Sequence, residues 1–129
     1  MTKNNPFTPP SATLPIIQKL IVSYKIWHGY LPKFSKDHRY TLGFKIDSLF
    51  IGITEILYEA QYTSFKQKQS LLAKASLKID ILKFFLQILW EIGGIDNKKY
   101  AHLSENVAEV GKMIGGWIKE NNLKNQTLL

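Results

Sequence analysis

Residues 63–92 read TSFKQKQSLLAKASLKIDILKFFLQILWEI, a run that contains neither proline nor glycine. A helix through this run would span roughly 45 Å at 1.5 Å per residue. Its apolar residues recur at alternating spacings of three and four, as on a helix face that packs inside a bundle. This seam comprises Leu72, Ala75, Ile79, Leu82, Leu86 and Leu89. The run therefore predicts one long central helix on which the rest of the chain packs.

A second apolar stripe lies on the same predicted helix. At 100° per residue it falls roughly 150° from the seam, on the side that would otherwise face solvent. Its members are Leu77, Ile81, Phe84 and Ile88. We expect this stripe to form an interface between copies of the chain, because a small bundle has too few helices to enclose one of them completely. The alternative is that short neighbouring helices of the same chain cover it.

The same spacing of apolar residues predicts three further helices, at about residues 14–29, 36–62 and 97–121, and no segment shows a strand pattern. Residues that end or cap helices separate them: Gly29, Pro32, Ser35, Gly93, Gly94 and Asp96. Short links favour an all-α, antiparallel up-down-up-down four-helix bundle over residues 14–121. We expect a flexible proline-rich tail at 1–13, and a flexible C-terminal tail at 122–129 because the last helix should fray from Asn121.

The last predicted helix carries an unusual set of glycines. Gly111 and Gly115 are four residues apart and share one side, and Gly116 follows. Glycine in a helix interior costs about 1 kcal/mol relative to alanine. The glycines therefore indicate close packing against another backbone, with Trp117 as an anchor in the core. The alternative is that they are tolerated at an exposed site.

The composition limits the possible functions. The chain has 129 residues, which suits one domain, and it has no cysteine, which excludes disulfides and thiolate chemistry. Lys and Arg outnumber Asp and Glu by 17 to 10, and this net charge of +7 suits a polyanionic partner, although a solvated lysine surface is the alternative. No apolar run reaches the roughly 20 residues of a membrane span, and the N-terminus lacks a signal-peptide pattern. We expect a cytoplasmic protein that does not bind membranes.

The residues needed for catalysis or metal binding are scattered. The three histidines lie in different predicted helices, and none has a histidine four residues away: His28, His38 and His102. The acidic pairs at 55/59 and 105/109 fit outer helix faces better than a di-metal site. Arg39 is the one arginine and lacks the following histidine found in some helical-bundle ribonucleases. We therefore expect no enzyme activity, no metal and no cofactor.

Basic residues follow two parts of the chain. One set lies at the start of the second predicted helix: Lys33, Lys36 and Arg39. The other lies along the central helix: Lys74, Lys78 and Lys83. Lysines on a rigid helix can follow a phosphate backbone through counterion release, which does not depend on sequence. These residues are the candidates for binding nucleic acid.

Three segments of the chain resemble a known family: LPK at 31–33 with RYTLG at 39–43, LKFFL at 82–86, and AEVGKMIGGWI at 108–118. They are similar to the accessory variability determinant of diversity-generating retroelements. The resemblance implies a basic four-helix bundle that assembles into a homopentameric barrel. It also implies association with the retroelement's reverse transcriptase and binding of RNA, an RNA–DNA hybrid or DNA, in support of mutagenic copying of a template RNA into complementary DNA.

The resemblance carries over to individual residues. Arg39, Lys83 and Lys112 match basic positions of the family, and this resemblance adds Lys112 to the candidates for binding nucleic acid. Gln87 stands where a family member has a second arginine. Arg39 and Lys112 could equally be structural ion-pair partners, and Lys74 and Lys78 rest on charge and helix geometry alone.

Two other interpretations remain open at this point. Bundle proteins encoded in intervening sequences of large-subunit ribosomal RNA genes share the expected fold, but they usually carry Asn-Ile-Ala-Glu-Gly late in the second helix, where this chain reads ILYEA at 56–60. Alternatively, the chain is a structural adaptor whose basic surface contacts an acidic protein.

Overall fold

The computed structural model describes residues 14–128, which are helical apart from short connections and contain no strand. The elements are α1 (Pro15–Tyr30), the 3-10 turn η1 (Leu31–Lys33), α2 (Lys36–His38), the π-helical turn η2 (Arg39–Gly43), α3 (Phe44–Gln61), α4 (Phe65–Glu91) and α5 (Asn97–Leu128). The predicted N-terminal tail lies outside the described residues.

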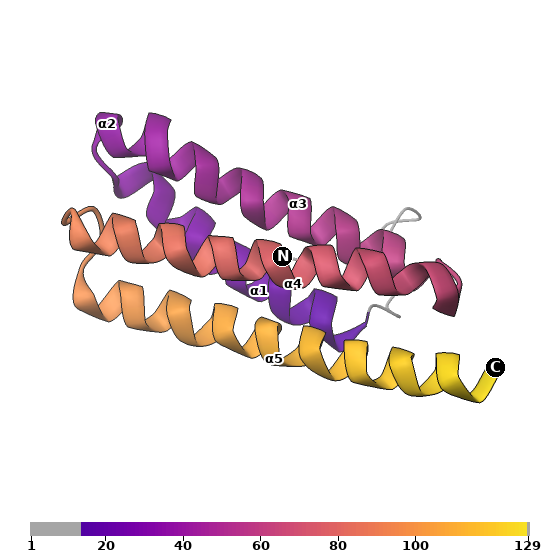
Figure 1. The fold of residues 1–129 in the computed structure, drawn as a ribbon. Coiled ribbons are helices and arrows are strands. Elements are labelled where there is room, and N and C mark those ends of the chain that lie inside the picture. Colours follow the sequence, from indigo (N-terminus) through magenta and orange to yellow (C-terminus); the bar gives the residue numbers. More distant parts are fainter. Residues whose placement is uncertain (1–13, 129) are drawn as a thin grey trace, which may run out of the picture.

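The main helices run alternately up and down the bundle (Figure 1). α4 packs between α3 and α5, and α1 packs against both α5 and α3. One end of the bundle, here called the α2 end, holds η1, α2 and the α4–α5 connection. The opposite end holds the start of α1, the α3–α4 connection and the end of α5 (Figure 1). The predicted all-helical bundle is confirmed.

The seam of the central helix forms the middle of the core. All six seam residues, Leu72, Ala75, Ile79, Leu82, Leu86 and Leu89, are at most 1% exposed. The other helices supply the facing side chains, among them Trp27 and Phe50, whose rings stack with centroids 6.2 Å apart. Burying a side chain of this size contributes about 1.5–3 kcal/mol, so the seam is a principal source of stability.

The end of α4 follows the predicted glycine cap. Gly93 adopts a left-handed φ of 78°, which glycine accepts without steric cost. The Gly93 N–H donates to the Trp90 carbonyl at 3.0 Å, and the Gly94 N–H donates to the Leu89 carbonyl at 2.8 Å. This pair of bonds is a Schellman motif, which satisfies carbonyls at the helix end and turns the chain into α5.

Two predicted N-caps are also confirmed. The Ser35 hydroxyl accepts a hydrogen bond from the His38 N–H at 3.4 Å. The Asp96 carboxylate accepts one from the Lys99 N–H at 2.8 Å. Each cap satisfies a backbone donor that has no partner within its own helix.

The second predicted helix contains a turn that the periodicity did not indicate. α2 runs into α3 through the π-helical turn η2, so the chain stays helical from Lys36 to Gln61. A β-carbon on Gly43 would lie 3.1 Å from the His38 carbonyl oxygen and 3.1 Å from Leu31 Cδ1. The missing side chain at Gly43 therefore allows this wide turn to pack closely against η1.

The end of α5 differs from the prediction that the chain frays at Asn121, because the helix continues to Leu128. Asn121 is 2% exposed, and its amide donates to the Phe65 carbonyl at 3.1 Å and to Gln69 Oε1 at 3.3 Å. Asn125 donates to the same Phe65 carbonyl at 3.0 Å. These amides attach the end of α5 to the first turns of α4, which a polar composition alone does not reveal.

The glycines of α5 divide into two kinds. A β-carbon on Gly111 would lie 3.3 Å from Ile79 Cγ2, so close packing is confirmed there. At Gly115 and Gly116 no such contact lies within 4 Å, so the expected packing is not made within the chain. Trp117 is half-buried and packs against the core.

Of the described helices, none has the length and apolar character needed to cross a membrane.

Candidate nucleic-acid interface

The first group of candidate residues lies at the α2 end. Lys33 in η1 and Lys36 in α2 are exposed, whereas Arg39 is half-buried. Arg39 Nη2 donates to the Phe34 carbonyl at 3.3 Å and thereby holds the connection between η1 and α2 in place. The two lysines, called the α2-end group below, can reach a ligand, while Arg39 has a structural role in addition to its charge.

The three candidates on α4 do not share one face. Lys74 and Lys78 are four residues apart and lie on the same side, but Lys83 is about 140° around the helix from Lys78. The Lys83 ammonium lies 3.3 Å from the position of a β-carbon on Gly111, so this side chain extends toward α5. The three lysines predicted together on the central helix therefore lie on two different sides of α4.

Lys74 and Lys78 belong to the flank of α4 that faces α3. Phe85, seven residues after Lys78, points to the same side, and Lys45 of α3 places its ammonium 5.9 Å from the centroid of that ring. Lys45, Lys74 and Lys78 together are called the α3–α4 group. Along one flank of the bundle, they provide positive charge from two helices.

Lys83 and Lys112 form the α4–α5 group. Lys112 is exposed on α5, one residue after Gly111, against which Lys83 lies. Lys112 also lines a polar pocket of about 390 Å³ that includes Glu105 and Glu109. These carboxylates offset part of the positive potential around Lys112. Within this group, Lys83 therefore contributes more to the attraction of an anion.

None of the seven candidate residues forms an ion pair with another described residue. The ion pairs in that part of the chain join Lys99 with Asp96 and Lys124 with Glu120. The candidate charges are therefore not neutralised by neighbouring carboxylates at contact distance. A phosphate backbone can be held by charges of this kind.

Lys68, which the sequence places with the other lysines of the central helix, is only 8% exposed. Its ammonium lies 5.1 Å from the Phe65 ring centroid and 5.5 Å from the Trp117 ring centroid. Such cation–π contacts compensate part of the cost of burying the charge. Lys68 thus joins α4 to α5 and is not available to a polyanion.

The second apolar stripe of α4 is only partly covered within the chain. Leu77 is 61% exposed and Phe84 is 57% exposed, while Ile81 and Ile88 are half-buried. Helices of the same chain therefore do not enclose this stripe, as the alternative interpretation had required.

A further exposed apolar stripe runs along α3 and was missed in the sequence. Its members are spaced by seven, seven and four residues, which puts them on one side of the helix: Phe44, Ile51, Tyr58 and Tyr62. Tyr58 and Tyr62 contact each other edge to face, with ring centroids 5.4 Å apart. The spacing was readable from the sequence, but the inward residues of the same helix masked it.

The three histidines lie on three different helices. They lie in α1, α2 and α5, and no three His, Asp or Glu side chains gather in the described part of the chain in a way that would hold a metal ion. His102 Nδ1 instead contacts the Tyr30 hydroxyl at 3.3 Å. This contact links α5 to α1.

A family model described as bAvd-like matches residues 16–121. The chain belongs to the bAvd-like family. It is an Avd-like protein of diversity-generating retroelements, as the three sequence segments indicated. The match includes every candidate basic residue of the Avd-like chain. The comparison with curated proteins gave no match.

Membership of the family sets a coarse function. Avd-like proteins have an accessory role in diversity-generating retroelements, are associated with the reverse transcriptase system of these elements, and are generally non-catalytic.

Proposed function

We propose that this Avd-like protein is a non-enzymatic, nucleic-acid-binding accessory subunit that associates with a retroelement reverse transcriptase and supports mutagenic complementary-DNA synthesis. The observation that carries the proposal is the family match over residues 16–121. The net charge of +7 and the absence of ion pairs at the candidate lysines within residues 14–128 support it. The ligand would be RNA, an RNA–DNA hybrid or DNA, bound through phosphates.

The proposal includes self-association. Leu77 and Phe84 expose apolar surface on α4, and Phe44, Ile51, Tyr58 and Tyr62 expose it on α3. Two different apolar faces on one protomer favour a head-to-tail contact, and such contacts close into a ring when the rotation permits. A homopentameric ring would bring five copies of each basic group together. The electrostatic attraction for a polyanion would then be much larger than that of one copy.

The basic groups can be compared by paired charge reversal, in which each pair changes the net charge by the same amount. The three test pairs are Lys33→Glu with Lys36→Glu, Lys74→Glu with Lys78→Glu, and Lys83→Glu with Lys112→Glu. A matched control reverses two exposed lysines toward the opposite end of the bundle, Lys66→Glu with Lys119→Glu. Binding to a structured RNA and to an RNA–DNA hybrid is measured for each variant at several salt concentrations.

A pair that contacts phosphates should weaken binding and lower the salt slope by about 1 for each lost contact. The control pair should leave the slope unchanged. Equal losses in all four variants would show that net charge, and not these groups, determines binding, and the site assignment would fail.

Self-association can be tested by Phe84→Glu, with Gln18→Glu as an exposed control on α1. Removing a phenylalanine that is buried between two copies should lower the association free energy of each interface by about 1.5–3 kcal/mol. This loss weakens each contact by roughly tenfold or more. Light scattering should then show smaller species for Phe84→Glu alone. If Phe84→Glu keeps the mass of the parent assembly, the stripe is not the interface.

A further inference from the structure

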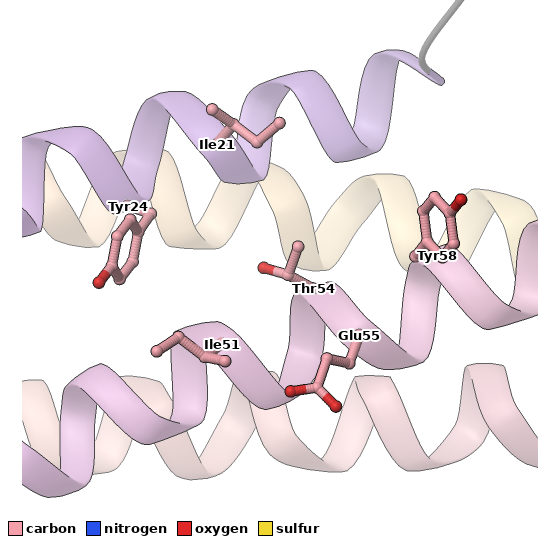
Figure 2. Close-up of a pocket in the computed structure, with 6 residues that line it drawn as sticks. All are labelled: Ile21, Tyr24, Ile51, Thr54, Glu55 and Tyr58. Atoms are coloured by element: carbon pink, nitrogen blue, oxygen red, sulfur yellow. The ribbon is translucent and has the colours of Figure 1, made fainter. Parts of the chain in front are cut away.

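A pocket between α1 and α3 shares Ile51 and Tyr58 with the α3 stripe, but the proposed function assigns no occupant to the pocket itself. It has a volume of about 590 Å³, within the range of ligand-binding sites. Its lining comes from the two helices only: Ile21 and Tyr24 of α1, and Ile51, Thr54, Glu55 and Tyr58 of α3 (Figure 2). Ile21, Ile51 and Tyr58 are 40%, 45% and 58% exposed, so an occupant would bury substantial apolar surface.

The pocket wall is held in place by contacts beneath it. The Tyr24 ring meets Phe50 edge to face at a centroid distance of 5.8 Å, and Phe50 itself is fully buried. The Thr54 hydroxyl donates to the Phe50 carbonyl at 2.7 Å. Because these side chains are fixed by the core, the pocket is formed before any occupant arrives, which lowers the entropic cost of binding.

The lining selects a particular chemistry. Tyr24 and Tyr58 supply aromatic surface, the two isoleucines supply aliphatic surface, and Glu55 supplies the charge. Aromatic-lined grooves are the surfaces on which proline-rich segments dock, because the polyproline helix is preformed and loses little entropy. Glu55 adds a preference for a segment that carries a cation and lacks acidic residues.

Such a segment is present in this chain. Residues 1–13 read MTKNNPFTPPSAT, with three prolines, the large apolar residue Phe7, the cation Lys3 and no acid. They lie outside the described residues and join the bundle at Leu14, directly before α1. The charge of Lys3 is opposite to that of Glu55.

The lengths are compatible with docking. Ile21 and Tyr24 lie seven and ten residues after Leu14, so the α1 side of the pocket is about 10–15 Å along the helix from the attachment point. Phe7 lies seven residues before Leu14 and can reach roughly 22 Å at about 3.1 Å per residue. The segment can therefore fold back and place Phe7 in the pocket without tension.

We propose that the N-terminal segment 1–13 of the same chain docks in the α1–α3 pocket, with Phe7 and the neighbouring prolines between Tyr24 and Tyr58 and the segment's positive charge near Glu55. Docking covers Ile51 and Tyr58, which form the middle of the α3 stripe. A second copy or a partner protein that binds this face would compete with the segment.

The absence of cysteine makes disulfide trapping a direct test in the full-length protein. The test pair is Thr8→Cys with Thr54→Cys, which leaves Phe7 and the apolar lining intact. The control pair is Thr8→Cys with Ala108→Cys. Ala108 is half-buried, as Thr54 is, and lies on the other side of α1 about 12 Å along α5 from Gly116, which lines a pocket together with Leu14.

Under mild oxidation the Thr54 pair should form an intramolecular disulfide at least about tenfold faster than the Ala108 pair, because docking raises the local concentration of the thiol. Adding Phe7→Ser to the Thr54 pair should reduce its rate to that of the control. Equal rates for the two pairs, or a rate unaffected by Phe7→Ser, would overturn the proposal. Cross-links formed mainly between chains would also overturn it, since the pocket would then hold a segment of another copy.

Discussion

Replacing Gly94 by alanine tests how closely the α4–α5 connection is packed. A β-carbon at this position would lie 3.0 Å from His38 Nδ1, 3.1 Å from the Leu89 carbonyl oxygen and in outright overlap with Leu89 Cδ1. Leu89 is fully buried and its carbonyl belongs to the Schellman motif, so neither atom can move without disturbing the core or the helix end. Overpacking of this kind typically costs about 1–3 kcal/mol.

The expected result is a lower midpoint of thermal unfolding. A chain of this size loses roughly 4 °C in its unfolding midpoint for each kcal/mol, so Gly94→Ala should lower the midpoint by roughly 4–12 °C. Unfolding is followed by circular dichroism at one fixed protein concentration, because self-association would make the midpoint depend on concentration.

Gly115→Ala is the matched control. The added β-carbon meets no atom of another helix within 4 Å and lies inside a helix, so the substitution should raise the free energy of unfolding by about 0.5–1 kcal/mol. A Gly94→Ala variant as stable as the parent would refute the packing argument. A clear loss at Gly115→Ala would show that another copy packs closely on this part of α5.

Three further predictions follow from individual contacts. Asn121→Ala should lower the free energy of unfolding by about 1–2 kcal/mol in urea titrations, because buried hydrogen bonds to α4 are lost. The same change at the exposed Asn122 should have little effect, and equal effects would contradict the docking of α5 on α4. Asp47→Ala should lower the free energy of unfolding by about 1–3 kcal/mol. The indole N–H of buried Trp27, which lies 3.1 Å from the Asp47 carboxylate, would lose its partner. An unchanged free energy would mean that another acceptor replaces the carboxylate. Burial and the hydrogen bond to Asp47 raise the pKa of Tyr24 above its ordinary 10.0, so the stabilisation from the neutral phenol is complete below pH 10 and is lost as pH rises through the raised pKa. Stability should therefore fall more steeply above pH 10 in the parent than in Tyr24→Phe, and parallel pH profiles would contradict this assignment.

The sequence predicted the bundle because its main signals are local. The spacing of Leu72, Ile79 and Leu86 determines which side of α4 is buried, and all three are at most 1% exposed. Gly93 and Asp96 act through their own backbone conformation and hydrogen bonds, so the helix boundaries they set could also be predicted.

Features that depend on contacts between distant residues could not be predicted in this way. Asn121 reads as a polar residue near the end of a helix, but the Phe65 carbonyl 56 residues away makes it an interior anchor. Lys68 reads as a surface charge until the rings of Phe65 and Trp117 are seen beside its ammonium. Periodicity describes one helix at a time and does not show which groups of other helices lie opposite.

The candidate site shows the same limit. The sequence grouped Lys74, Lys78 and Lys83 as one patch because they share a helix, but the rotation between Lys78 and Lys83 directs them toward different neighbours. The Lys83 ammonium lies 3.3 Å from the position that a β-carbon on Gly111 would take, which identifies α5 as the neighbour of Lys83. One copy therefore offers several smaller basic groups, and a long continuous surface would require several copies.

The most direct test of the proposed function is the binding of the purified protein to a structured RNA and to an RNA–DNA hybrid across a salt titration. We predict that the logarithm of the association constant falls linearly with the logarithm of salt concentration, with a slope of about −0.7 to −0.9 for each phosphate contact. A slope that corresponds to several contacts would support the accessory-subunit account. No binding at low salt, together with retained binding to a retroelement reverse transcriptase, would contradict it and identify the protein as a structural adaptor.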